Sequence, residues 1–385
     1  MLMLETAIKA SSILCVGKEW FPNTPGGLNR YVYELIHQLA ASGDSVELCA
    51  SNLPNSCTQP SLALTNLAAV QQPLPQRLWT SQQQFQQRSL VTPDAINLHF
   101  ALYSFPLLNA LPQDIPITFT FHGPWAMESA KEGQFSLNIW LKRRMEQHVY
   151  DRCDRFIVLS QAFGTILHQS YGISWDRIHV IPGGVNTEWF CPRLSKTAAR
   201  EALGWPLDRP ILFTPRRLVQ RMGIDVLLQA MAEVKTQVPE VWLAIAGKGP
   251  QRERLEALSQ TLGLEHHVHW LGYLPDDDLP TAYQAADLTV VPSQSLEGFG
   301  LILLESLASG TPALSTPIGG MPEVLTPLNP KLVTESKDAG AIAERLIHFL
   351  THPDQLPDQQ TCRQYACDTF AWLKIAHRVR DVLLM

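Results

Sequence analysis

The sequence has no apolar run that approaches the ~20 residues of a membrane-spanning helix. Its N-terminus lacks the basic-then-apolar layout of a signal peptide. Its seven cysteines are odd in number and include no C-x-x-C pair, which argues against a disulfide framework and a zinc site. A net charge of −6 argues against general nucleic-acid binding. These absences predict a reduced, cytoplasmic globular protein.

What the sequence does contain is an alternation of short β-rich segments and longer helical patterns. A chain of 385 residues is long enough for two domains. In the first half an amphipathic helix between Leu28 and Leu39 joins the first two predicted strands, and strand–helix–strand order is typical of a parallel sheet. The strands predicted there are Ser12–Gly17, Ser45–Ala50, Ala95–Phe100, Ile117–His122, Arg155–Ser160 and His179–Pro182.

The same alternation restarts after a proline-containing stretch at Cys191–Pro210. Helical patterns there cover Ile224–Val234 and Leu301–Ala308. The sequence therefore predicts two doubly wound α/β domains, which bind ligands at the carboxyl ends of their strands and face each other across a cleft. The strands predicted in this half are Pro210–Thr214, Val241–Gly247, Val268–Leu271, Leu288–Val291 and Pro312–Ser315.

Two stretches interrupt this alternation. Residues 52–90 are rich in proline, glutamine and serine, which favours a loop or an irregular helical hairpin over a core element. Ala126–Tyr150 is helical and carries the basic run Lys142–Arg144. That run leaves two interpretations open, contact with an anionic membrane surface or a solvated helix face.

The most informative segment is Glu297–Glu305, which follows a predicted strand and opens a helix. Glycines near a helix start let backbone amides approach an anion such as a diphosphate. Carboxylates would repel phosphate but accept hydrogen bonds from sugar and ribose hydroxyls. The alternative interpretation is a capping Glu297 and a surface Glu305.

Glu297 and Glu305 match the E-x7-E element of retaining GT-B glycosyltransferases, and the chain resembles the large family 4 group. The resemblance implies two Rossmann-like domains that face an interdomain cleft. It implies an acceptor-side domain at 1–190, a nucleotide-sugar domain at 191–368, and a terminal helix at 369–385 that crosses back. Further segments that match in order are Pro22–Gly27, Phe121–Gly123, Ile181–Asn186, Arg217–Val219, Gly247–Pro250, Ser309–Pro312, Gly319–Glu323 and Phe370–Trp372.

The resemblance also implies roles for particular side chains. His122 would lie against the transferred sugar, Arg217 would hold the diphosphate, and Glu297 would accept from sugar hydroxyls. Arg216, next to Arg217 in the sequence, is expected at the surface. His99, at the end of another strand, is a weaker candidate for a site residue. The expected donor-binding set is Gly26, Gly27, Arg221, Gly298, Phe299, Gly300, Leu301 and Glu305, with Glu305 on the ribose.

Two positions depart from the family pattern. Met222 stands where the family usually has a lysine, so one expected phosphate cation is missing, and the adjacent Arg221 is expected to replace it in part. Asn186 stands where the family often has aspartate, and it is expected to shape the turn between the domains.

The expected function is therefore retaining transfer of a hexose from a UDP-, GDP- or ADP-linked donor to a glycan, lipid-linked or small-molecule acceptor. No metal and no further cofactor is expected, and Asp276–Asp278 is interpreted as a helix cap. No side chain suits a covalent nucleophile, which favours a front-side reaction. The alternatives are a nucleotide-sugar epimerase of the same fold and a non-catalytic sugar-nucleotide-binding partner subunit. The expected location is cytoplasmic, with peripheral contact at the inner face of the membrane left open.

Overall fold

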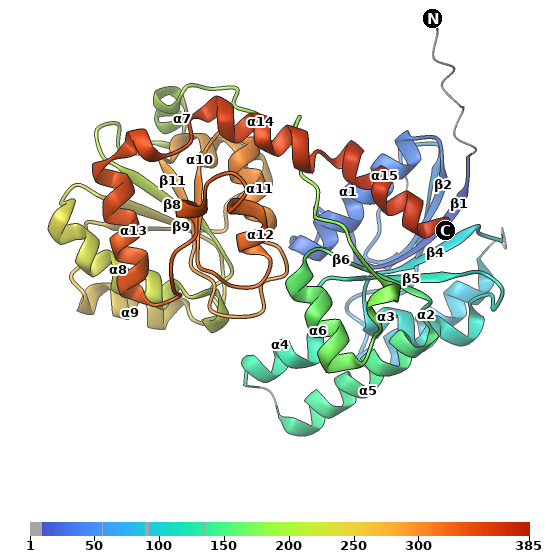
Figure 1. The fold of residues 1–385 in the computed structure, drawn as a ribbon. Helices are drawn as coiled ribbons and strands as arrows, with labels where there is room; N and C mark the ends of the chain where they lie inside the picture. Colours follow the sequence, from blue (N-terminus) through green and yellow to red (C-terminus); the bar gives the residue numbers. More distant parts are fainter. Residues whose placement is uncertain (1–9, 56, 89–91, 134) are drawn as a thin grey trace, which may run out of the picture.

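The computed structural model describes residues 10–55, 57–88, 92–133 and 135–385. It contains two α/β halves, each built on one parallel sheet (Figure 1). The first sheet has the order β3-β2-β1-β4-β5-β6-β7 and the second β10-β9-β8-β11-β12. The strands are β1 (Ser12–Glu19), β2 (Ser45–Ser51), β3 (Leu62–Asn66), β4 (Ala95–Leu98), β5 (Ile117–Phe121), β6 (Arg155–Val158), β7 (Ile178–Val180), β8 (Ile211–Pro215), β9 (Trp242–Ala246), β10 (Val268–Gly272), β11 (Leu288–Val291) and β12 (Ala313–Ser315).

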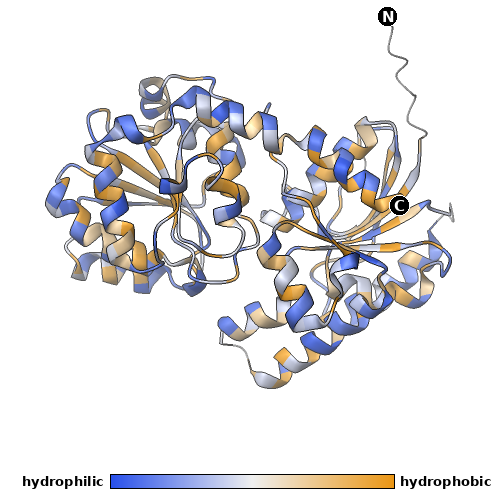
Figure 2. Cartoon of the chain, viewed as in Figure 1, coloured by the Kyte–Doolittle hydropathy of each residue, from blue (hydrophilic) through white to orange (hydrophobic). Residues whose placement is uncertain are grey.

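Helices cover both sheets, and hydrophobic residues alternate with hydrophilic ones along them (Figures 1 and 2). Within the described residues, none of them is both long and apolar enough to cross a membrane. The helices are α1 (Gly27–Ala41), α2 (Leu74–Gln87), α3 (Ala101–Ser104), α4 (Trp125–Lys131), α5 (Ser136–Arg152), α6 (Gln161–Tyr171), α7 (Lys196–Leu203), α8 (Ile224–Gln237), α9 (Arg252–Thr261), α10 (Leu279–Ala285), α11 (Leu301–Ala308), α12 (Met321–Leu325), α13 (Ala339–Thr351), α14 (Gln359–Phe370) and α15 (Trp372–Leu383).

The strand order reverses once in each sheet, between β1 and β4 and between β8 and β11. Ligands of doubly wound sheets bind outside the carboxyl ends of the strands at such a reversal. The loops after β1 and β4 in one half, and after β8 and β11 in the other, are therefore the places to look for a site.

Every strand that the sequence predicts is present, with ends displaced by at most two residues. The interpretation of residues 52–90 as lacking a core element was wrong. Leu62–Asn66 forms β3, which pairs in parallel with β2 at the sheet edge. Its single buried residue, Leu62, gives no alternating pattern, and the edge position explains why. The predicted helical region Ala126–Tyr150 is divided between α4 and α5.

Two chain segments cross between the halves side by side. The amide of Val185 donates to the carbonyl of Phe370 at 2.8 Å, and the amide of Trp372 donates to that of Val185 at 3.3 Å. Beyond this crossing α15 packs against α1 (Figure 1). Its Arg380 donates to both carboxylate oxygens of the buried Asp44, at 2.7 and 2.8 Å. A bidentate pair of this kind fixes the last helix on the N-terminal half.

Candidate active site

Two glycine-rich helix starts meet between the halves. Gly26 precedes α1 with φ of 150°, a conformation that favours glycine, and Gly27 opens the helix. Leu301 opens α11 after Gly300, whose φ is 81°. A Cβ atom on Gly27 would lie only 3.8 Å from Cδ1 of Leu301. The positive ends of both helix dipoles therefore lie at one place, which suits an anion with two phosphate groups.

The loop before α11 also contacts the N-terminal half. A Cβ on Gly183 would lie 2.5 Å from Cδ2 of Leu301, so a larger residue would force the loop to shift. The hydroxyl of Ser160 donates to the carbonyl of Gly298 at 2.7 Å. Phe299 is buried against the Gly183 segment. The expected donor-binding residues of this loop are thus held at the interface between the halves.

Glu297 directly precedes Gly298 of this loop, and its carboxylate forms an ion pair with the guanidinium of Arg216. Ser293 also donates to Oε2 of Glu297, at 3.0 Å. Burial alone would raise the pKa of Glu297, yet the Arg216 charge and hydrogen bond outweigh it and hold the pKa below its usual value. Glu297 is therefore a carboxylate at neutral pH, ready to accept hydrogen bonds.

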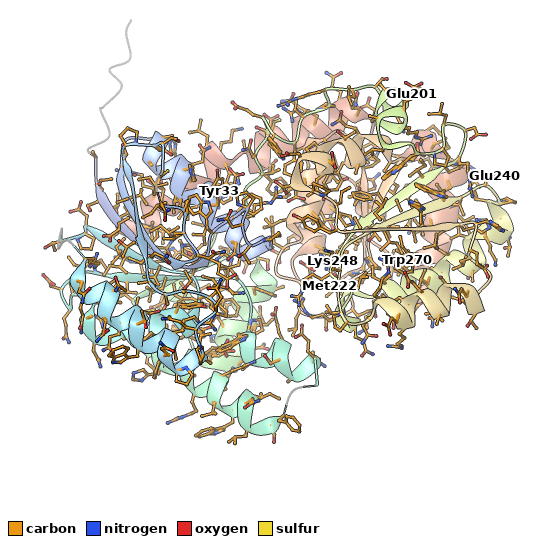
Figure 3. All side chains as sticks on the ribbon, turned by 180° about the vertical axis from the view of Figure 1, so that it is seen from behind. Tyr33, Glu201, Met222, Glu240, Lys248 and Trp270 are labelled. Atoms are coloured by element: carbon orange, nitrogen blue, oxygen red, sulfur yellow. The ribbon has the colours of Figure 1, made fainter. Side chains whose placement is uncertain are left out.

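The expectation that Arg216 lies at the surface was wrong, because its side chain is buried. Arg216 follows β8 and turns inward toward Glu297, and it also contacts the sulfur of Met222. Arg216 is therefore the cation in contact with the side chain of Met222. Met222 lies at the end of a 3₁₀ helix, Gln220–Met222, in the C-terminal half (Figure 3).

Arg217 turns the opposite way, toward the N-terminal half. Its side chain is 63% exposed, and Nη2 lies 3.9 Å from Oε1 of Glu132. Arg221 is more buried and lies 3.6 Å from Glu128 and 3.8 Å from Glu132. Burial raises the pKa of Glu128, while Arg221 opposes that rise. Sequence reasoning did not find these two acids, because nothing in the sequence around them indicates that they face the segment after β8 in the other half.

His122 follows β5 and forms a pair with His99 from the end of β4. Nε2 of His122 and Nδ1 of His99 are 3.2 Å apart. Tyr31 packs edge-on against the His122 ring, with centroids 4.8 Å apart. Burial lowers the pKa of His122 to about 3 and that of His99 well below its usual value, so both rings are neutral at pH 7. This hydrogen bond fixes the orientation of the His122 ring.

Glu305 is buried, which excludes the surface interpretation of this residue. The hydroxyl of Tyr283 donates to Oε2 at 2.8 Å, and Nε of Arg30 lies 3.7 Å from Oε1. Arg30 comes from α1, so it joins the two halves, and it also pairs with Asp276. Burial raises the pKa of Glu305, and the charge of Arg30 limits that rise. A pocket at this junction is lined by Arg30, Tyr31, Glu34, Asn186, Leu301 and Glu305, among others.

Asp276–Asp278 form a 3₁₀ turn directly before α10, and Asp278 occupies the N-cap position of that helix, as expected, although its side chain makes no capping hydrogen bond. Across residues 10–55, 57–88, 92–133 and 135–385, no three histidine, cysteine or acidic side chains are grouped to hold a metal ion.

Asn186 shapes the first crossing segment. Its side-chain oxygen accepts from the amides of Glu188 and Trp189, at 3.2 and 3.0 Å. Its amide nitrogen donates to the buried Glu34 at 3.3 Å. An aspartate at position 186 would keep the first two hydrogen bonds, but it would place a second carboxylate next to that of Glu34. Burial already raises the pKa of Glu34.

Asn186→Asp should therefore destabilise the protein by about 1–3 kcal/mol at pH 7, the typical cost of leaving a buried polar group unsatisfied. The cost should shrink as the pH falls, because Glu34 then takes up a proton and its hydroxyl can donate to the new carboxylate. Urea unfolding at neutral and mildly acidic pH measures both effects. Asn329→Asp is the matched control, since Asn329 accepts from the amide of Lys331 at 3.0 Å in the same way. Equal effects at both positions would contradict the account of the Asn186–Glu34 contact.

Comparison with known proteins places this arrangement in a family. The glycosyltransferase family 4 model matches residues 25–189, and the model of glycosyl transferases group 1 matches residues 195–368. A D-inositol 3-phosphate glycosyltransferase from Corynebacterium diphtheriae is 28% identical over 390 residues, covering 93% of this chain and 89% of the relative.

A protein of the same name from Corynebacterium urealyticum is 33% identical over 223 residues. That alignment covers 56% of this chain, and it spans about half of the relative, 52% of its length. The solved structure of sucrose-phosphate synthase from Thermosynechococcus elongatus superposes with a TM-score of 0.81 at 25% identity, covering 97% of this chain and 98% of the other. The chain is thus a member of the GT-B glycosyltransferases of family 4.

Proposed function

We propose that this glycosyltransferase moves a hexose from a UDP-, GDP- or ADP-linked donor to a hydroxyl acceptor with retention of the anomeric configuration. The observation that carries the proposal is the meeting of the α1 and α11 N-termini at Gly27 and Leu301. Backbone amides at such helix starts suit a diphosphate. We infer that the amides of Gly298, Phe299 and Gly300 approach the donor phosphates.

The carboxylates of Glu297 and Glu305 bind the hydroxyl groups in this proposal. Glu305 accepts hydrogen bonds from the ribose hydroxyls. To do so, it gives up part of its present contacts with Arg30 and Tyr283. Glu297 accepts from the sugar while Arg216 keeps it ionised. The His122 ring, which His99 orients, lies against the sugar near the reacting carbon.

Charge on the departing diphosphate is met by Arg217, by Arg221 and by the two helix dipoles. The exposed guanidinium of Arg217, whose ion pair with Glu132 is 3.9 Å long, can turn to a phosphate without unfolding its surroundings. Fixed donors aimed at developing charge are a large source of rate enhancement. The proposal therefore requires no bound metal and no further cofactor.

A front-side reaction, in which the departing phosphate takes the acceptor's proton, fits the carboxylates present. Glu297 is held by Arg216 and Glu305 by Arg30. Glu128, which lies beside Gly123 on the other half, faces Arg221. Each of these three acids is paired with an arginine. This pairing favours a role in binding and positioning the donor over a role as a nucleophile that attacks the sugar.

The N-terminal half receives the acceptor, which we place among glycans, lipid-linked sugars and small molecules. The proposed location is cytoplasmic. Peripheral membrane contact would involve α5, where Leu137, Trp140 and Leu141 are exposed near the basic run that ends at Arg144. No nucleic-acid partner is part of the proposal.

Proton NMR of the product from a donor of known anomeric configuration tests the reaction class. A thermal-shift screen against nucleotide sugars selects the donor first, because a bound ligand raises apparent stability. The expected product keeps the configuration of the donor. An inverted anomer would refute the front-side reaction.

A further inference from the structure

The first turn of α6 joins the N-terminal half to the loop before α11, residues Glu297–Gly300, which we call the donor loop. Ser160 precedes α6, and its hydroxyl accepts from the amide of Phe163 at 3.2 Å, the hydrogen bond of a helix N-cap. The same hydroxyl donates to the carbonyl of Gly298 at 2.7 Å. One side chain thus caps a helix of the N-terminal half and binds the donor loop of the other half.

The C-terminal half contributes a second contact to the same turn. The carboxylate of Glu323, on α12, accepts from the amides of Gln161 and Ala162, at 2.9 and 3.1 Å. Amides at the start of a helix have no partner within it, and the helix dipole favours a negative charge there. The amide of Gly320, three residues before Glu323, donates to the carbonyl of Glu297 at 3.2 Å. Both contacts therefore connect α6 to the donor loop and its immediate surroundings.

Phe163 fills the space between the donor loop and His122. Its ring is buried and lies edge-on against Phe121, the residue before His122, with centroids 5.5 Å apart. A Cβ atom on Gly298 would lie 2.9 Å from Cε2 of Phe163. A Cβ atom on Gly123, the residue after His122, would lie 3.6 Å from the same ring atom. The donor loop and both neighbours of His122 therefore pack around one aromatic ring.

We propose that the first turn of α6, the α6 bridge (Ser160–Phe163), positions the transferred sugar against His122. Gly298 and Glu323 hold the bridge from the donor side, and Phe163 sets the separation between the donor loop and the His122 segment. The bridge residues and Glu323 are positioning residues, because none of them contacts the donor or the acceptor in the proposed function. The inference rests on that function, since it requires the donor sugar to lie between α11 and His122.

The test compares Ser160→Ala and Glu323→Ala with wild type by calorimetry. The ligands are UDP and UDP-glucose, GDP and GDP-mannose, and ADP and ADP-glucose, and the pair that wild type binds most tightly is measured in both variants. Each variant should bind the nucleotide sugar roughly 3–10-fold more weakly, as expected for the loss of one hydrogen bond, and the nucleoside diphosphate within about 2-fold of wild type.

The diphosphate site should change less because other contacts hold it. Gly27 and Leu301 meet at the two helix starts, and the chain crossing joins Val185 to Phe370. None of these four residues belongs to the bridge. A displaced bridge would therefore move the sugar relative to His122 and leave the diphosphate between the helix starts.

Two matched variants separate positioning from helix capping. Ser195 caps α7 by accepting from the amide of Ala198 at 3.2 Å, and Asp338 caps α13 by accepting from that of Ala341 at 3.0 Å. Both helices lie within the C-terminal half, so Ser195→Ala and Asp338→Ala should lower thermal stability and leave both affinities unchanged. Glu323→Gln keeps one acceptor oxygen, and its loss should lie between that of Glu323→Ala and wild type.

Phe163→Leu tests the spacer directly, because it shortens the side chain without adding a polar group. It should show the same selective loss of nucleotide-sugar affinity. Thermal unfolding shows whether this variant is folded at the temperature of the titration. If it is not, Ser160→Ala and Glu323→Ala decide the proposal.

Two results would overturn the bridge and leave the transferase function intact. One is a nucleotide-sugar affinity that is unchanged in Ser160→Ala or in Glu323→Ala. The other is an equal loss of affinity for the nucleotide sugar and for the nucleoside diphosphate. If wild type binds none of the three nucleotide sugars, the proposed function fails instead.

Discussion

Replacement of Arg217 by alanine should lower turnover by roughly 10²–10³-fold, the loss seen when one charge-stabilising donor is removed. The side chain is 63% exposed, and its ion pair with Glu132 is 3.9 Å long. Pairs of that kind contribute about 0–1 kcal/mol to folding. Stability should therefore stay close to that of wild type, and the loss should appear in kcat more than in the affinity for the donor.

Arg254→Ala is the matched control for this variant. Arg254 is 58% exposed and lies 3.9 Å from Asp225, so its folding contribution is of the same kind, but it lies on α9 away from the meeting helix starts. Steady-state kinetics and thermal unfolding of both variants separate the two roles. Normal turnover in Arg217→Ala would remove this residue from the diphosphate site.

Breaking the Arg216–Glu297 pair should have the largest effect on stability. The Arg216 and Glu297 side chains are only 7% and 14% exposed, and loss of one leaves the other as an uncompensated charge, which typically costs about 3–5 kcal/mol. Glu297→Gln and Arg216→Met should each show this loss in urea unfolding. The double variant should be less destabilised than the sum of the two, because no unpaired charge then remains.

The effect of Glu297→Gln should also depend on pH. The pKa of Glu297 is lower in the folded than in the unfolded chain. Its ionisation therefore contributes stability above the unfolded value of about 4.3, and that contribution is lost as the pH falls through the folded value. The difference between wild type and Glu297→Gln should narrow at acidic pH. Additive losses, or a difference that is independent of pH, would contradict the buried pair.

Turnover should fall in all three of these variants, since Glu297 also accepts from the sugar in the proposed function. The losses in Glu297→Gln and in the double variant should persist under conditions in which the variants are folded, because both lack the carboxylate. Arg216→Met retains the Glu297 carboxylate, so the turnover of this variant should exceed that of Glu297→Gln.

The fold was predictable because buried parallel strands read as short apolar runs between helical patterns. β11 at Leu288–Val291 and α11 at Leu301–Ala308 appear with the predicted ends. β3 was missed because an edge strand with one buried residue carries no such pattern. The hydrophobic pattern of a strand reflects how many of its side chains are buried, and an edge strand buries few.

The candidate site was predictable only in its backbone. Glycine pairs before helices identified Gly26, Gly27 and Gly300 from their sequence positions. The directions of adjacent side chains were not predictable in the same way. Arg216 and Arg217 follow one strand, and successive residues point to opposite sides, but the sequence does not say which side is buried. Pairing partners from the other half, such as Arg30 and Glu128, depend on how the halves meet.

A crystal structure with the nucleoside diphosphate that gives the largest thermal shift tests the central claim most directly. The account predicts the diphosphate between the starts of α1 and α11, within hydrogen-bond distance of the Phe299 and Gly300 amides and of Arg217, with the ribose on Glu305. A nucleotide bound elsewhere, or one whose phosphates contact neither helix start, would contradict it.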